Sequence, residues 1–186
     1  MMSPARIYEQ GVAAEYQWAL PVDSSDFQCS LLFDGSSKAE GWVPVRMYLL
    51  ERHSARAKRL KRADLPWSGH DSIALSSHAV DVLGPFLLRY GELLPLSCES
   101  EELWVFNITN VVDALIEEAS DLERFSTGRI MMINRHVFDP VAIGDSEMFR
   151  IPQLLRSPIF VTQSFVDLVD TTGLKGTPFG LVWELD

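Results

Sequence analysis

The stretch ELWVFNITNVVDALIEEASD, residues 102–121, passes from a dense apolar run into a carboxylate-rich one. Its first five residues are typical of a short strand. Asn110 is then a good helix N-cap, with Asp113 in the position of a capping box. The apolar residues that follow recur at helical spacing and would share one face: Val111, Val112, Leu115, Ile116, Ala119 and Leu122. The sequence therefore predicts a helix after Asn110, with Val112, Leu115, Ile116 and Ala119 facing the core.

This predicted helix would also carry the candidate site residues of the chain, which are carboxylates. Asp113, Glu117 and Asp121 are spaced i, i+4 and i+8, so they would form an exposed stripe opposite the apolar face. A metal needs further ligands, and the sequence has no HExxH motif, Cys/His cluster or EF-hand loop. A solvated face is therefore favoured, and no catalytic, cofactor-binding or metal residues are assigned. A second hypothesis is that an acidic face contacts a positively charged partner, through Asp113, Glu117, Glu118 and Asp121.

The rest of the chain mixes strands and helices without regular βαβ alternation. Residues 92–97 and 102–106 are predicted to form a hairpin across the polar CESE. Other strands are expected within residues 43–50, 72–75, 129–138, 148–151, 157–162 and 176–185. One helix should start at a cap formed by Ser76 or Ser77 and be kinked or divided at Gly84-Pro85, and another should run from about Ser164 to near Gly173. This pattern predicts an α+β fold, with a mixed, mostly antiparallel sheet and a few packed helices, in a single domain over residues 1–186.

The charge of the chain is unevenly distributed. Its formal net charge is −10, but residues 51–62, ERHSARAKRLKR, hold six Lys or Arg against one acid, a balance of +5. The remainder is therefore at −15, from ten bases and 25 acids. The basic run lacks interleaved aromatics and fits no recognisable nucleic-acid module. A solvated helix or loop that pairs with the acidic remainder is favoured, and no nucleic-acid partner is expected.

Cysteine content and hydropathy indicate the compartment. The two cysteines, Cys29 and Cys98, have no CxxC spacing, which points to a reducing environment. The first residues lack the apolar core of a signal peptide, and the apolar runs are far shorter than the ~20 residues needed to span a bilayer. A cytoplasmic protein without a membrane partner is expected.

Catalytic motifs give little support for an enzyme. The sequence has no GxSxG elbow, P-loop or GxGxxG after a strand. Its histidines are scattered along the chain, at His53, His70, His78 and His136. A serine, a histidine and an aspartate could still meet in space, because triads are defined by geometry. A small hydrolase with a non-motif Ser/His/Asp site therefore remains the alternative function.

Several segments, taken in order, are characteristic: ADLPW (63–67), SIALSSHAVDVL (72–83), ELLPL (92–96), WVFNITNVVDAL (104–115), MFRI (148–151), SPIFVTQSFVDLV (157–169) and TGLKGTPF (172–179). Together they resemble the immunity protein 11 family of bacterial polymorphic toxin systems. The resemblance covers about residues 63–186, and residues 1–62 form a more variable part. Family members often have a second acid after the Val-Val-Asp-Ala-Leu pattern, where this chain has Ile116. The resemblance implies a cytoplasmic, non-catalytic protein without a cofactor, which binds and neutralises a cognate bacterial toxin. It leaves the toxin's activity and any self-association open.

Overall fold

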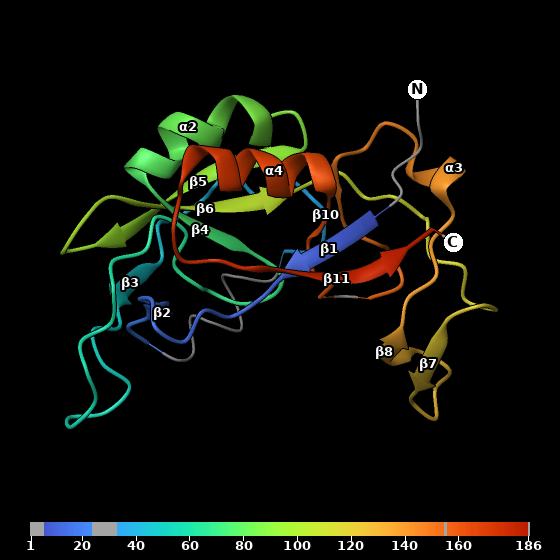
Figure 1. Cartoon of the computed structure of the whole chain (residues 1–186), viewed down its shortest axis with the longest axis horizontal. Coiled ribbons are helices and arrows are strands. Elements are labelled where there is room, and N and C mark those ends of the chain that lie inside the picture. The colour runs from blue at the N-terminus through green and yellow to red at the C-terminus, as the bar shows by residue number, and fades with distance from the viewer. Residues whose placement is uncertain (1–5, 24–32, 155, 186) are drawn as a thin grey trace.

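The computed structural model describes residues 6–23, 33–154 and 156–185, and its strands form two larger sheets and one hairpin (Figure 1). The four-stranded sheet has the order β11-β1-β10-β9, from Phe179–Glu184, Arg6–Gln10, Phe160–Thr162 and Met148–Phe149. The five-stranded sheet has the order β2-β3-β5-β6-β4, from Ala19–Pro21, Arg46–Leu49, Gly91–Cys98, Leu103–Ile108 and Ile73–Ser76. The hairpin pairs β7, Asp121–Arg124, with β8, Ile130–Arg135.

The strand pairs of both larger sheets are antiparallel except β3–β5, which is parallel. The described helices are α2, Ser77–Leu87, α3, Pro140–Ile143, and α4, Gln163–Thr172. The predicted α+β fold with a mixed, mostly antiparallel sheet is confirmed. The predicted hairpin is also present, as β5 paired with β6.

Helices α2 and α4 lie side by side along the top of the molecule in Figure 1, and they close one core. Phe86 of α2 and Phe165 of α4 touch, with ring centroids 5.1 Å apart. The core beneath them also takes Leu75 from β4 and Phe106 from β6. The helices therefore cover the sheets on this side. No helix in the described part of the chain is long and apolar enough to cross a membrane.

The cap residues expected at the helix ends predicted both α2 and α4. Ser76 caps α2, since its hydroxyl accepts a hydrogen bond from the Ala79 amide at 3.3 Å. Gly173 ends α4 with a φ of 74°, a left-handed conformation that glycine adopts without strain. Of the predicted kink or division at Gly84-Pro85, the division is not found, because α2 runs from Ser77 to Leu87 with Pro85 inside it. Pro85 lies in the last turn, where its missing N–H removes a single helical hydrogen bond.

The helix predicted after Asn110 is wrong. The segment 109–120 is irregular: most of its backbone hydrogen bonds reach distant segments, and its internal bonds close only short turns, such as the bond from Ser120 N–H to the Ile116 carbonyl at 3.0 Å. Val112 N–H donates to the Arg150 carbonyl at 2.8 Å, and Ile116 N–H donates to the Val137 carbonyl at 2.8 Å. The Ala114 carbonyl accepts from Asp139 N–H at 2.8 Å. Because these tertiary bonds satisfy the groups that a helix would pair internally, the local helical periodicity is overridden.

The extended path also changes which apolar side chains are buried. Leu115 is 7% exposed and packs in a core with Phe138, Phe149 and Phe160, as predicted. Val112 is half-buried against the same core. Ile116 and Ala119 were expected in the core but are exposed, and this part of the prediction is wrong. In an extended segment neighbouring side chains point to opposite sides, which separates Leu115 from Ile116.

Replacing Leu115 or Ile116 with alanine tests this conformation. Leu115→Ala should lower the free energy of unfolding by about 2 to 5 kcal/mol, because it removes a buried side chain and leaves a cavity. Ile116→Ala, the matched control, should change it by less than about 0.5 kcal/mol, as at most exposed positions. Chemical denaturation measures both values. Similar losses in the two variants would contradict the extended path and favour the helix.

Candidate partner-binding site

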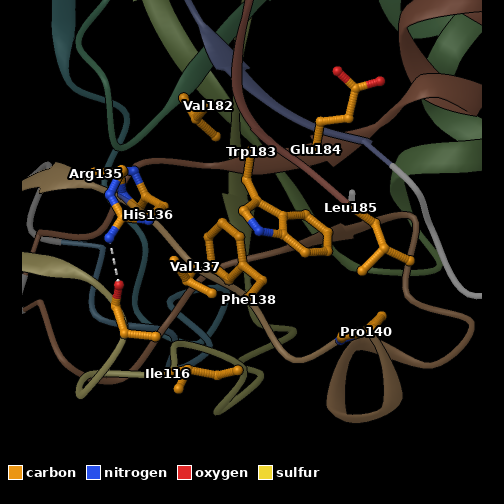
Figure 2. A pocket seen from close by; sticks show the side chains of 11 residues that line it. Ile116, Arg135, His136, Val137, Phe138, Pro140, Val182, Trp183, Glu184 and Leu185 are labelled. Atoms are coloured by element: carbon orange, nitrogen blue, oxygen red, sulfur yellow. Dashed lines mark hydrogen bonds between the residues drawn. The ribbon is translucent and has the colours of Figure 1, made fainter.

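An open groove of about 780 Å³ lies between three segments that are distant in sequence (Figure 2). The first is the turn at residues 116–119, the second is residues 135–140, and the third is the end of β11 with the residue after it. The lining side chains are mostly apolar or aromatic: Ile116, Ala119, Arg135, His136, Val137, Phe138, Pro140, Val182, Trp183, Glu184 and Leu185. We call this the β11 groove.

The base of the groove is aromatic. The Phe138 and Trp183 rings meet edge to face, with centroids 6.0 Å apart. His136 stacks on Phe138 with centroids 5.5 Å apart and an interplanar angle of 15°. Phe138 is buried whereas Trp183 and His136 are half-buried, so the latter two retain surface that a partner could contact. Aromatic rings in such positions supply large apolar contact areas.

One wall of the groove is the turn at residues 116–121, which we call the acidic turn because it contains Glu117, Glu118 and Asp121. The Ser120 hydroxyl donates to the Ile116 carbonyl at 2.8 Å and accepts from the Val137 amide at 3.0 Å. Arg135 donates from its guanidinium to the Ala119 carbonyl at 2.8 Å, the bond drawn in Figure 2. These bonds fix the turn against residues 135–137.

The four predicted site residues do not form the helical stripe expected of them. Asp113 is exposed just before the acidic turn, and its carboxylate accepts a hydrogen bond from the Gln153 side-chain amide at 2.5 Å. Glu117 pairs with Arg124 at 2.6 Å, across two partly exposed side chains. Glu118 and Asp121 are exposed, and no ion pair joins either to a base among the described residues. The structure thus places Glu117, Glu118 and Asp121 in one turn, and Asp113 in the irregular segment that leads into it.

The groove itself was not predicted from the sequence. Residues 135–138 and 182–185 were predicted to lie in strands, with no sign that they would meet the acidic turn. The alternation of apolar and polar residues predicts which side chains face the core and which face solvent. It does not predict which distant segments pack together. Leu185 is apolar and exposed after β11. Single exposed apolar residues are common on protein surfaces, so Leu185 did not indicate a groove in the sequence.

The β7–β8 hairpin starts at Asp121, the last residue of the acidic turn, and ends at Arg135, which lines the groove. It projects from the lower right of the molecule in Figure 1. Phe125, Met131 and Met132 are each 45–48% exposed on it. Methionine side chains are flexible and adapt to different partner surfaces. The hairpin therefore extends the exposed apolar surface beyond the groove.

The histidines do not assemble the catalytic site of the alternative hydrolase among the described residues. His53 bonds to the Ala14 carbonyl at 2.8 Å, and His70 packs edge to face on Trp67. His78 is exposed on α2, and His136 lies at the groove. No hydrogen bond joins a histidine ring to a serine hydroxyl in the part of the chain that the structure describes. Over the same residues, no group of three or more His, Cys, Asp or Glu could hold a metal ion.

The basic run at residues 51–62 is an exposed loop. Arg59 pairs with Glu51 at 2.7 Å and Arg62 pairs with Glu101 at 2.8 Å. Part of its charge is thus matched by carboxylates of the chain, as the sequence suggested. Of the two cysteines, Cys98 is a half-buried free thiol in β5, and Cys29 lies outside the described residues.

Burial has a marked effect on His136. It lowers the pKa of the imidazole from 6.5 to about 4, because the apolar surroundings disfavour the charged form. The ring also contacts Phe160 edge to face, with centroids 5.3 Å apart. At neutral pH His136 is therefore an uncharged part of the groove.

This pKa shift predicts how stability depends on pH. Between about pH 6.5 and 4 the unfolded chain binds a proton at His136 that the folded chain does not, so stability falls as the pH falls through this window. His136→Phe keeps an aromatic ring and should reduce this loss. His78→Phe, at an exposed position, is the matched control and should follow the wild type. Parallel profiles for wild type and His136→Phe in urea denaturation at several pH values would contradict the assignment.

Residues 95–183 match the model of the Immunity protein family (Imm11). No curated protein matches the chain. The matched stretch begins in β5, runs through the acidic turn and the hairpin, and ends at Trp183 in the groove. The resemblance predicted from the sequence is therefore confirmed: over residues 95–183 the chain matches the Immunity protein family (Imm11).

Proposed function

We propose that this chain is a cytoplasmic immunity protein that binds a cognate bacterial toxin and neutralises it without catalysis. The observation that carries the proposal is the match to an immunity protein family over residues 95–183. This stretch contains the acidic turn, the hairpin and most of the β11 groove, and we propose that the toxin-binding surface lies there. The chain is proposed to act as a single domain.

The charge of the chain supports a basic toxin as the partner. The net charge is −10, and it reaches −15 outside the basic run. A surface of this sign raises the encounter rate with a positively charged protein, most strongly at low ionic strength. It also repels nucleic acid, which agrees with a protein partner.

The acidic turn is the best candidate for the contact with such a toxin. Glu118 and Asp121 are exposed and form no ion pair with another described residue. The pair between Glu117 and Arg124 is partly exposed, and pairs of this kind contribute about 0 to 1 kcal/mol to stability. These carboxylates are therefore available to a partner at little cost to the fold.

Protection from the toxin encoded by the neighbouring gene tests the function. Cells that express that toxin should stop growing, and co-expression of this chain should restore growth. Inhibition by binding requires stoichiometric amounts, so the activity of the purified toxin should fall in proportion to added protein and vanish at the binding stoichiometry. Full inactivation by a small fraction of an equivalent would indicate catalysis, and no protection at matched protein levels would contradict an immunity function.

Neutralising the acidic turn tests its role in association. Glu118→Gln combined with Asp121→Asn should slow association with the toxin about threefold or more at low salt and flatten the salt dependence, because steering is electrostatic. The control removes the same charge from the helices, by Asp81→Asn with Asp170→Asn. Stopped-flow or surface-binding rates at two ionic strengths give the comparison. Equal rates and equal salt responses for both double variants would show that the acidic turn does not face the toxin.

A further inference from the structure

We propose that the β11 groove receives a large apolar side chain of the toxin while the acidic turn contacts basic residues that flank this side chain. The inference rests on the proposed function and adds the chemistry of the segment that is bound. It follows from the shape of the groove, from the residues that line it and from the charge around it.

The groove presents apolar surface on opposite sides. Ile116 on the acidic turn is 36% exposed, and Leu185 after β11 is 49% exposed. The half-buried Trp183 and His136 and the buried Phe138 line the same groove. Exposed apolar surface with a polar rim marks an interaction site. The volume of 780 Å³ falls in the range of roughly 300 to 1,000 Å³ that is usual for ligand sites, so one large side chain and its neighbours can enter.

The acidic and apolar features belong to the same wall. Glu117 and Glu118 lie between Ile116 and Ala119, and both of these flanking residues line the groove. A side chain that reaches Ile116 therefore brings its own neighbours in the toxin close to the two glutamates. This arrangement favours an apolar anchor with Lys or Arg next to it.

The surroundings of the groove are negative as a whole. Carboxylates number five in residues 113–124, one in residues 135–140 and one in residues 182–185, which gives seven. The opposing bases are Arg124, Arg135 and Arg6, which pairs with Glu184 at 2.7 Å, so the balance is −4. Arg135 is held against the Ala119 carbonyl. His136 adds no positive charge near neutral pH, since burial lowers its pKa to about 4.

This charge also decides between possible occupants. A second copy of the chain would bring another net charge of −10, and like charges close together weaken association. A basic toxin segment meets complementary charge instead. Apolar anchors in desolvated pockets usually carry much of the affinity of a protein interface, and charges at the rim mainly set the association rate.

Substitutions at the two exposed apolar positions test the proposal with the toxin encoded by the neighbouring gene as the probe. Ile116→Arg and Leu185→Arg should each raise the Kd at least tenfold, mainly through faster dissociation. Ile116→Glu removes the same apolar contact but adds a charge of the opposite sign, so it should weaken binding several-fold less than Ile116→Arg. Leu88→Arg is the matched control, because Leu88 is 60% exposed next to α2, and it should change the Kd by less than twofold.

The outcomes separate the two levels of the proposal. If the wild type neither binds the toxin nor protects cells, the proposed function fails. If the wild type binds and protects but the groove variants bind within twofold of it, or if Leu88→Arg weakens binding equally, the groove inference alone is overturned. Equal effects of Ile116→Arg and Ile116→Glu would overturn the basic flank. Should an arginine variant fail to fold by circular dichroism, Ile116→Ala and Leu185→Ala replace it, with an expected loss of about threefold each and the same contradiction if there is none.

Discussion

The buried Arg150 is the residue on which the rest of this structure depends. Its side chain is 1% exposed, and burial lowers the pKa of its guanidinium while the charges of Asp71 and Asp34 act in the opposite direction. A buried charge is costly unless opposite charges and hydrogen bonds compensate it. Asp71 is itself buried and accepts a bond from Arg156 at 2.6 Å. The buried Asp71 carboxylate therefore links the charges of Arg150 and Arg156.

The backbone of Arg150 then fixes the segment that leads to the acidic turn. Its N–H donates to the Asn110 carbonyl at 3.0 Å, and its carbonyl accepts from Val112. Gly35 lies against this pairing with a φ of 92°, and a β-carbon there would come within 2.4 Å of Val111. With residues 110–114 extended, the chain reaches residues 137–139 and turns at 116–120. The turn thus becomes a wall of the β11 groove, and a helix at this position would not have formed that wall.

The sequence was sufficient where a local rule and the tertiary structure agree. Ser76 and Gly173 are cap residues whose own side chain or backbone determines the helix end, so α2 and α4 could be predicted. The segment after Asn110 has equally good helical spacing, but its hydrogen-bond partners at Arg150 and Val137 lie more than 20 residues away. Leu115 is buried under either conformation, whereas Ile116 distinguishes them. The groove forms where three segments that are distant in sequence pack together. Periodicity predicts the burial of some residues in these segments, but it does not predict that the segments meet.

We propose that one surface, assembled from residues 116–119, 135–140 and 182–185, binds the toxin. Hydrogen–deuterium exchange of the full chain, with and without the neighbouring toxin, tests this claim most directly, because it reads all three segments in one experiment. Backbone amides in these three segments should become protected together on binding, with little change in the basic run at residues 51–62 or in α2. Protection confined to the basic run or to the N-terminal third, with the three groove segments unchanged, would contradict it.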